Sequence, residues 1–184
     1  MVNAFEKVFH EFSIDFAVMS TSGDESLFNK LFGSQTSSML SVNEFPLVVL
    51  PEGASVSEIS NITIACDLSF DINYPGLSFV HKLFGENVKE YKVVSIVEKI
   101  EGFKINDSVK KQIEIKLGVH NTSFTITESE DVFEALNDYV IDTSSDLLVM
   151  FEKNYGFIES VFHKSLTKKM ILKSKKPLII LPSL

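Results

Sequence analysis

The sequence repeats itself at a fixed offset of 131 residues, so that residues 1–51 align without a gap on residues 132–182. A period of this length is that of a whole domain rather than of a solenoid repeat. We therefore expect the tail of one domain at 1–51, a linker at 52–60 and one complete copy at 61–184. The clearest matches are Asp15-Phe16-Ala17-Val18-Met19 with Asp146-Leu147-Leu148-Val149-Met150, and Pro46-Leu47-Val48-Val49-Leu50-Pro51 with Pro177-Leu178-Ile179-Ile180-Leu181-Pro182.

Short apolar runs alternate with segments of helical periodicity along the complete copy. Continuous runs of Val, Ile and Leu are typical of parallel strands that have helices on both faces. The alternation predicts an α/β fold with a parallel five-stranded sheet and helices on both faces, to which 1–51 adds two further α/β units. Ser129 is the expected N-cap of helix 130–142. The expected order is strand 61–66, helix 75–85, strand 91–98, helix 106–117, strand 120–127, helix 130–142, strand 146–151, helix 164–175 and strand 177–181.

Composition excludes several classes of partner. The net charge of −8 and the pI near 5.0 argue against nucleic acids and anionic membranes, which bind basic surfaces. No apolar run reaches the ~18–20 residues of a membrane span. The single cysteine, Cys66, cannot form an internal disulfide, and no signal peptide precedes the first strand. We expect a cytoplasmic protein, with Cys66 as an inert thiol in a buried strand.

A loop rich in Gly and Ser follows the predicted strand 16–19. It reads Ser20-Thr21-Ser22-Gly23, then nine residues, then Gly33-Ser34-Gln35-Thr36, and a helix and the strand 47–50 come next. Glycines allow the backbone to approach a phosphate, and a helix N-terminus adds a positive dipole end. The hydroxyl groups of Ser34 and Thr36 are further donors, so this loop is a candidate anion site.

With this loop the chain resembles the universal stress protein family, which belongs to the adenine nucleotide alpha hydrolase-like fold. Nucleotide-binding members of that family carry Gly-x2-Gly-x9-Gly-Ser/Thr after the fourth strand. Gly23, Gly33 and Ser34 match this pattern, whereas Ser20 stands at the first glycine. The family also places an aspartate after strand one, where this chain has Asp67. The resemblance implies a tandem member whose first domain lacks its front, with Gly23, Gly33, Ser34, Thr36 and Asp67 as candidate contacts for ATP or AMP with Mg²⁺.

The complete copy departs from the nucleotide-binding pattern. Phe151, Asn154 and Lys164 replace its three glycines, and a bulky aromatic side chain would crowd a phosphate. The candidate residues are therefore divided between the copies, since Asp67 lacks its own loop. Two hypotheses stay open. One is a stress-response protein that acts as a non-enzymatic binding or scaffold module without a self-contained nucleotide site. The alternative is an ATP- or AMP-binding stress protein that uses the Gly23–Ser34 loop, completed by a second chain.

The sequence contains no catalytic motif and no set of metal ligands. A low-activity ATPase is a third option, for which the sequence supplies no general base. Members of the family commonly pair through their last strands, so we expect the strands at 47–50 and 178–181 to lie together at a pseudo-two-fold axis. The strand at 16–19 would then have an open edge, and exposed edges invite pairing. We therefore expect a homo-oligomer in which a second chain covers this edge.

Overall fold

The computed structural model describes residues 11–21, 45–56, 58–69, 74, 76–118, 121–151 and 161–182. The strands are β1 (Ala17–Thr21), β2 (Leu47–Pro51), β3 (Asn61–Ala65), β4 (Glu90–Val97), β5 (Thr122–Glu128), β6 (Leu147–Phe151) and β7 (Leu178–Leu181). The helices are α3 (Leu77–Phe84), α4 (Asp107–Lys116), α5 (Val132–Asp142) and α6 (Val161–Lys173). Each of these elements overlaps the strand or helix predicted for its part of the sequence.

The described strands form one mixed sheet in the order β1-β2-β7-β6-β3-β4-β5. The five strands from β7 to β5 pair in parallel, while β2 pairs antiparallel with β7 and β1 pairs in parallel with β2. The parallel five-stranded sheet was predicted for residues 61–184, whose five described strands pair in parallel, but the sheet that contains them is mixed and has seven described strands. Strands from both predicted domains share it, and the division at 1–51 and 61–184 stays a prediction.

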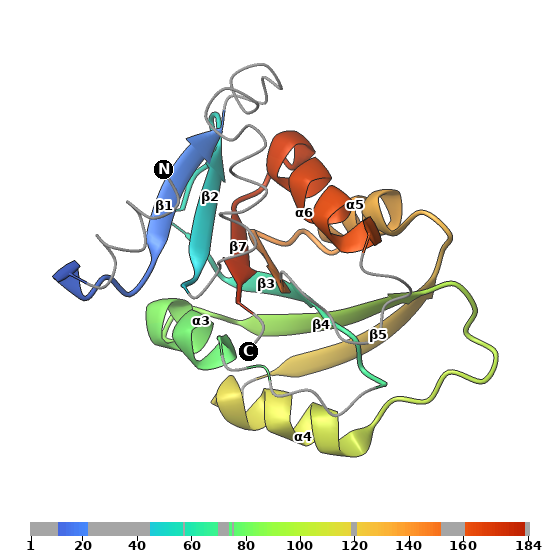
Figure 1. Cartoon of the computed structure of the whole chain (residues 1–184). Coiled ribbons are helices and arrows are strands. Elements are labelled where there is room, and N and C mark those ends of the chain that lie inside the picture. Colours follow the sequence, from blue (N-terminus) through green and yellow to red (C-terminus); the bar gives the residue numbers. More distant parts are fainter. Residues whose placement is uncertain are drawn as a thin grey trace.

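Helices cover both faces of the sheet, α3 and α4 on one face and α5 and α6 on the other (Figure 1). Each strand supplies both layers because successive side chains point to opposite faces. In β7, Ile179 packs in the layer under α3 and α4, whereas its neighbour Ile180 packs in the layer under α5 and α6. Both are fully buried. This two-sided burial explains why the strand runs are continuously apolar.

The N-cap of α5 is Asp131 and not the predicted Ser129. The Asp131 carboxylate accepts hydrogen bonds from the backbone N–H groups of Phe133 (2.9 Å) and Glu134 (3.1 Å). The Ser129 hydroxyl instead accepts from the N–H of Asp131 itself (3.1 Å), because Ser129 stands two residues before the N-cap. Both residue types favour N-caps, and the start of the helix decides between them.

The two strand pairs β1–β2 and β6–β7 have the same register at the repeat offset. Ala17 pairs with Leu47, and 131 residues later Leu148 pairs with Leu178; the next three pairs correspond in the same way. The hydrogen bond from Ala17 N–H to the Pro46 carbonyl (3.0 Å) recurs from Leu148 to Pro177 (3.0 Å). Ser13 and Ser144, which precede the strands, both have a φ of 50°. The sequence repeat is thus also a repeat of backbone structure.

The predicted contact between the last strands is confirmed within the chain. In the antiparallel β2–β7 pair, Val48 faces Ile179, its own counterpart at the offset of 131. Leu47 pairs with Ile180, and Val49 pairs with Leu178. The offset of 131 turns each of these two pairs into the other, because Leu178 is the counterpart of Leu47 and Ile180 is the counterpart of Val49. A pseudo-two-fold axis therefore passes through the Val48–Ile179 pair.

Candidate functional site

The strand order reverses direction between β3 and β6. From β3 the chain continues outward to β4 and β5 on one side, and then returns to β6 and β7 on the other. In open α/β sheets, ligands bind in the crevice at the carboxyl ends of the strands at such a switch point. The residues that follow β3 and end β6 therefore define the candidate site.

Two aromatic side chains occupy the switch point. Phe151 is the last residue of β6, and its ring lies against that of Tyr74, with centroids 4.7 Å apart and planes inclined by 49°. The Tyr74 hydroxyl donates a hydrogen bond to the carbonyl oxygen of Asp67, two residues beyond β3. Tyr74 is 1% exposed and Phe151 is 4% exposed. The chain thus fills the space between the ends of β3 and β6 with its own side chains.

The segment before α3 also lies close to the end of β7. A Cβ atom added to Gly76 would lie 2.8 Å from Cδ2 and 3.1 Å from Cβ of Leu181. The absence of a side chain at Gly76 lets the start of α3 approach the sheet.

Burial also raises the pKa of the Tyr74 hydroxyl, so this group stays protonated and remains a hydrogen-bond donor.

Asp67, the one predicted site residue within the described part of the chain, is 5% exposed. Its Oδ1 accepts hydrogen bonds from the backbone N–H (2.8 Å) and the hydroxyl (2.6 Å) of Ser69. The carboxylate therefore orders the loop after β3. The other predicted residues, Gly23, Gly33, Ser34 and Thr36, lie outside the described residues.

Cys66 precedes Asp67 and is 2% exposed. Burial raises the pKa of its thiol to about 12, so almost none of the reactive thiolate forms at neutral pH.

We expect Cys66 of the folded chain to resist alkylation by iodoacetamide at pH 8, and to react at least about 100-fold faster in urea, which exposes the thiol. Mass spectrometry over time measures both rates. Equal rates would contradict the buried position of this thiol.

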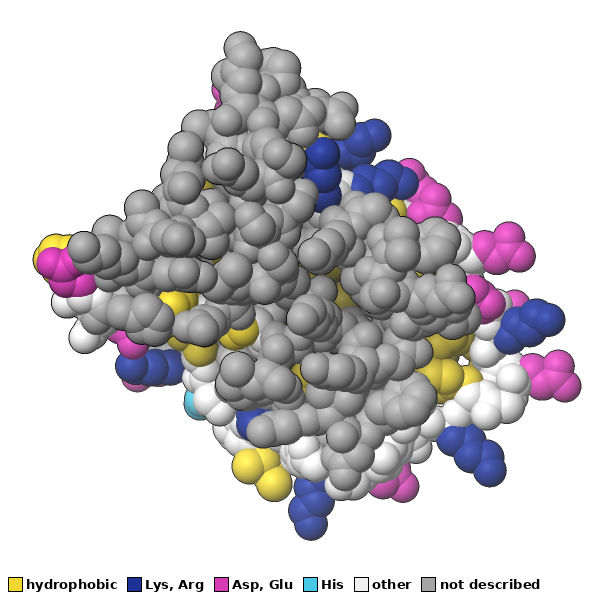
Figure 2. Space-filling model, viewed as in Figure 1, with side chains coloured by type: hydrophobic (Ala, Val, Ile, Leu, Met, Phe, Trp, Pro, Cys, Tyr) yellow, Lys and Arg dark blue, Asp and Glu magenta, His cyan; other side chains and the backbone are white. Residues whose placement is uncertain are grey.

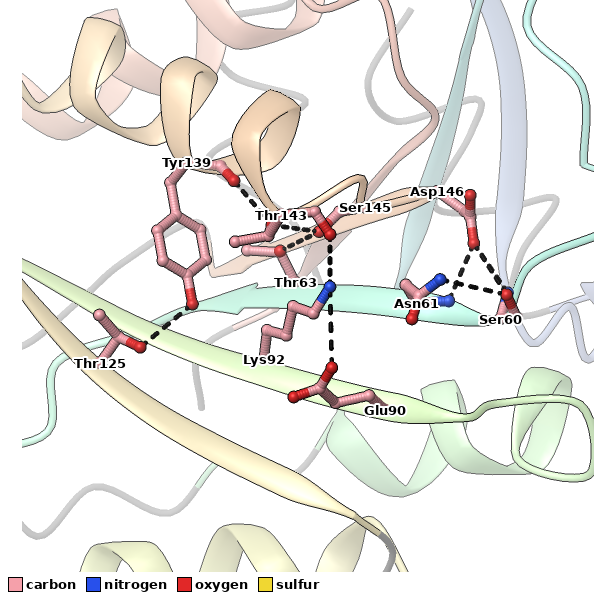
Figure 3. A network of polar contacts seen from close by, with 10 residues as sticks. All are labelled: Ser60, Asn61, Thr63, Glu90, Lys92, Thr125, Tyr139, Thr143, Ser145 and Asp146. Atoms are coloured by element: carbon pink, nitrogen blue, oxygen red, sulfur yellow. Dashed lines mark hydrogen bonds and ion pairs between the residues drawn. The ribbon is translucent and has the colours of Figure 1, made fainter.

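A second polar cluster joins the start of β6 to the start of β3 (Figure 3). The Asp146 carboxylate accepts hydrogen bonds from the backbone N–H groups of Ser60 (3.0 Å) and Asn61 (2.9 Å) and from the Ser60 hydroxyl (3.3 Å). Burial raises the pKa of Asp146, but these hydrogen bonds and the charge of Lys176 outweigh it, so the net pKa lies below its usual value.

The same figure shows a chain of hydroxyl groups beneath α5. Thr63 and Ser145 are fully buried, and their hydroxyl oxygens lie 2.6 Å apart. The hydroxyl oxygen of Ser145 also lies 2.9 Å from that of Thr143. Lys92 donates to the Thr143 carbonyl and lies 3.8 Å from Glu90. Each group has a partner, so this cluster joins elements together and leaves no group aimed at a ligand.

The described residues contain no metal centre: no three His, Cys, Asp or Glu side chains come together there to hold an ion. Within the same part of the chain, no helix is long and apolar enough to cross a membrane. In Figure 2, several basic side chains gather at the upper right of the view, and acidic side chains stand next to them and further down the right-hand side.

Sequence reasoning identified Phe151 and Asp67 but missed Tyr74. No sequence pattern marks Tyr74, because its role depends on the ring of Phe151, 77 positions away in the chain. Asp146 was also missed as a structural residue, although the repeat carries a signal for it, since Asp15 stands at the same place in the first copy.

Five parallel strands with a switch point between β3 and β6, and helices on both faces, make this an α/β protein. Its fold is that of the universal stress proteins. A universal stress protein from Archaeoglobus fulgidus DSM 4304 has a TM-score of 0.70 and 17% identity over 99% of this chain and 65% of its own. The hypothetical protein MJ0577 has a TM-score of 0.51 and 16% identity over 69% of this chain and 98% of its own. This chain thus spans about two thirds of the length of the first of these proteins.

A further solved structure, the universal stress protein from Archaeoglobus fulgidus in complex with dAMP, has a TM-score of 0.45 and 15% identity, covering 69% of this chain and 99% of its own. No protein-family model matches the sequence, and no curated protein matches it. The likeness to the first two of these structures, at 17% and 16% identity, is one of fold.

Proposed function

We propose that this chain is a universal stress protein-like binding module, cytoplasmic and part of a stress response, that acts without turnover and without a nucleotide at its switch point. The observation that carries the proposal is the packing of Tyr74 against Phe151, at 4.7 Å between ring centroids. A nucleotide at the ends of β3 and β6 would have to displace both buried rings. It would also compete with Ser69 for the Asp67 carboxylate.

The sequence around Phe151 supports the same proposal. A phosphate cradle needs glycines that let backbone N–H groups approach the anion. Phe151, Asn154 and Lys164 stand at the three glycine positions of the complete copy. Lys164 can attract an anion as a point charge, but it does not provide the backbone approach.

The second candidate function is ATP or AMP binding, with Mg²⁺, by the Gly23–Ser34 loop. The nine-residue spacing between Gly23 and Gly33, followed by Ser34, is the observation that favours it. In this candidate the nucleotide is held by the first copy, and another chain supplies the groups that the front of a domain provides.

Isothermal titration calorimetry of the whole chain with ATP and Mg²⁺ tests the proposal, together with thermal denaturation in the presence and absence of the nucleotide. At millimolar nucleotide we expect no binding heat and no shift in the melting temperature. Binding that Gly33→Val removes would contradict the proposal and support the second candidate. The matched control is Lys164→Val, which changes the corresponding position of the other copy.

Phosphate release measured in the same samples tests the low-activity ATPase, for which we expect no turnover.

The homo-oligomer that covers the edge at 16–19 stays a prediction. Light scattering at micromolar concentration measures the mass of the chain in solution. A stable monomer would contradict the prediction, while a dimer or larger species would support it.

A further inference from the structure

We draw no further inference here: the strongest candidate, the fully buried hydroxyl group of Ser95 near the carboxyl end of β4, which has no hydrogen-bond partner among the described residues, lies beside Cys66 at the end of β3 and belongs to the switch-point site already described.

Discussion

Replacing Phe151 with alanine is expected to lower the free energy of unfolding by about 3–5 kcal/mol, the range for a buried aromatic residue that leaves a cavity. The ring lies at the end of a central strand, 4% exposed, and packs on Tyr74 and the layer under α3 and α4. Its loss leaves the ring of Tyr74 without the aromatic ring that packs against it. Urea denaturation followed by circular dichroism measures the change.

Phe12→Ala is the matched control, since Phe12 is 67% exposed. That substitution should change the free energy of unfolding by no more than about 0.5 kcal/mol. A loss below about 1 kcal/mol for Phe151→Ala would show that the ring does not fill the crevice in solution, and would remove the main support for a switch point closed to nucleotides.

Replacing Asp146 with asparagine is expected to cost about 1.5–3 kcal/mol at pH 7, the range for hydrogen bonds to a charged group. The carboxylate accepts from two backbone N–H groups and one hydroxyl at the start of β3. All three donors bond to Oδ2, so an amide can keep an acceptor oxygen at that place but removes the negative charge that strengthens the three hydrogen bonds. Asp138→Asn, on the exposed face of α5, is the matched control and should be nearly neutral.

The cost of Asp146→Asn should also depend on pH. The folded-state pKa of Asp146 lies below its usual value, so its contribution is present above the unfolded pKa of about 3.9 and is lost as the pH falls through the folded pKa. Urea denaturation at pH 7 and at pH 3 should therefore show a smaller difference between variant and wild type at pH 3. A difference that stays the same at both values would contradict a role for the charge.

The arrangement of elements could be predicted from the sequence because the strands are continuously apolar. The expected strand 61–66 is found at Asn61–Ala65, and the expected helix 164–175 at Val161–Lys173. The resemblance to the universal stress protein family predicted that the strands at 47–50 and 178–181 meet at a pseudo-two-fold axis, as they do. What we did not predict is the consequence of that axis, that backbone pairing of the two last strands joins both copies into one mixed sheet.

The candidate site was harder to predict, because it depends on contacts between distant residues. The departure at Phe151 was visible as a mismatch between the copies, but its packing on Tyr74 was not. Asp67 was placed correctly after β3, while its bond to Ser69 depends on the local turn of the loop. Similarly, only the structure separates Asp146, which holds the start of β3, from Asp15, which has no such strand to hold among the described residues.

The antiparallel contact through Val48 and Ile179 has a consequence for how this chain responds to dilution and to mutation. An interface between identical subunits dissociates when the protein is dilute, and one substitution changes both of its sides. Here the two sides belong to one polypeptide, so their effective concentration is fixed by the connection between them. Each side is also encoded separately, so the valine and the isoleucine can change independently of each other.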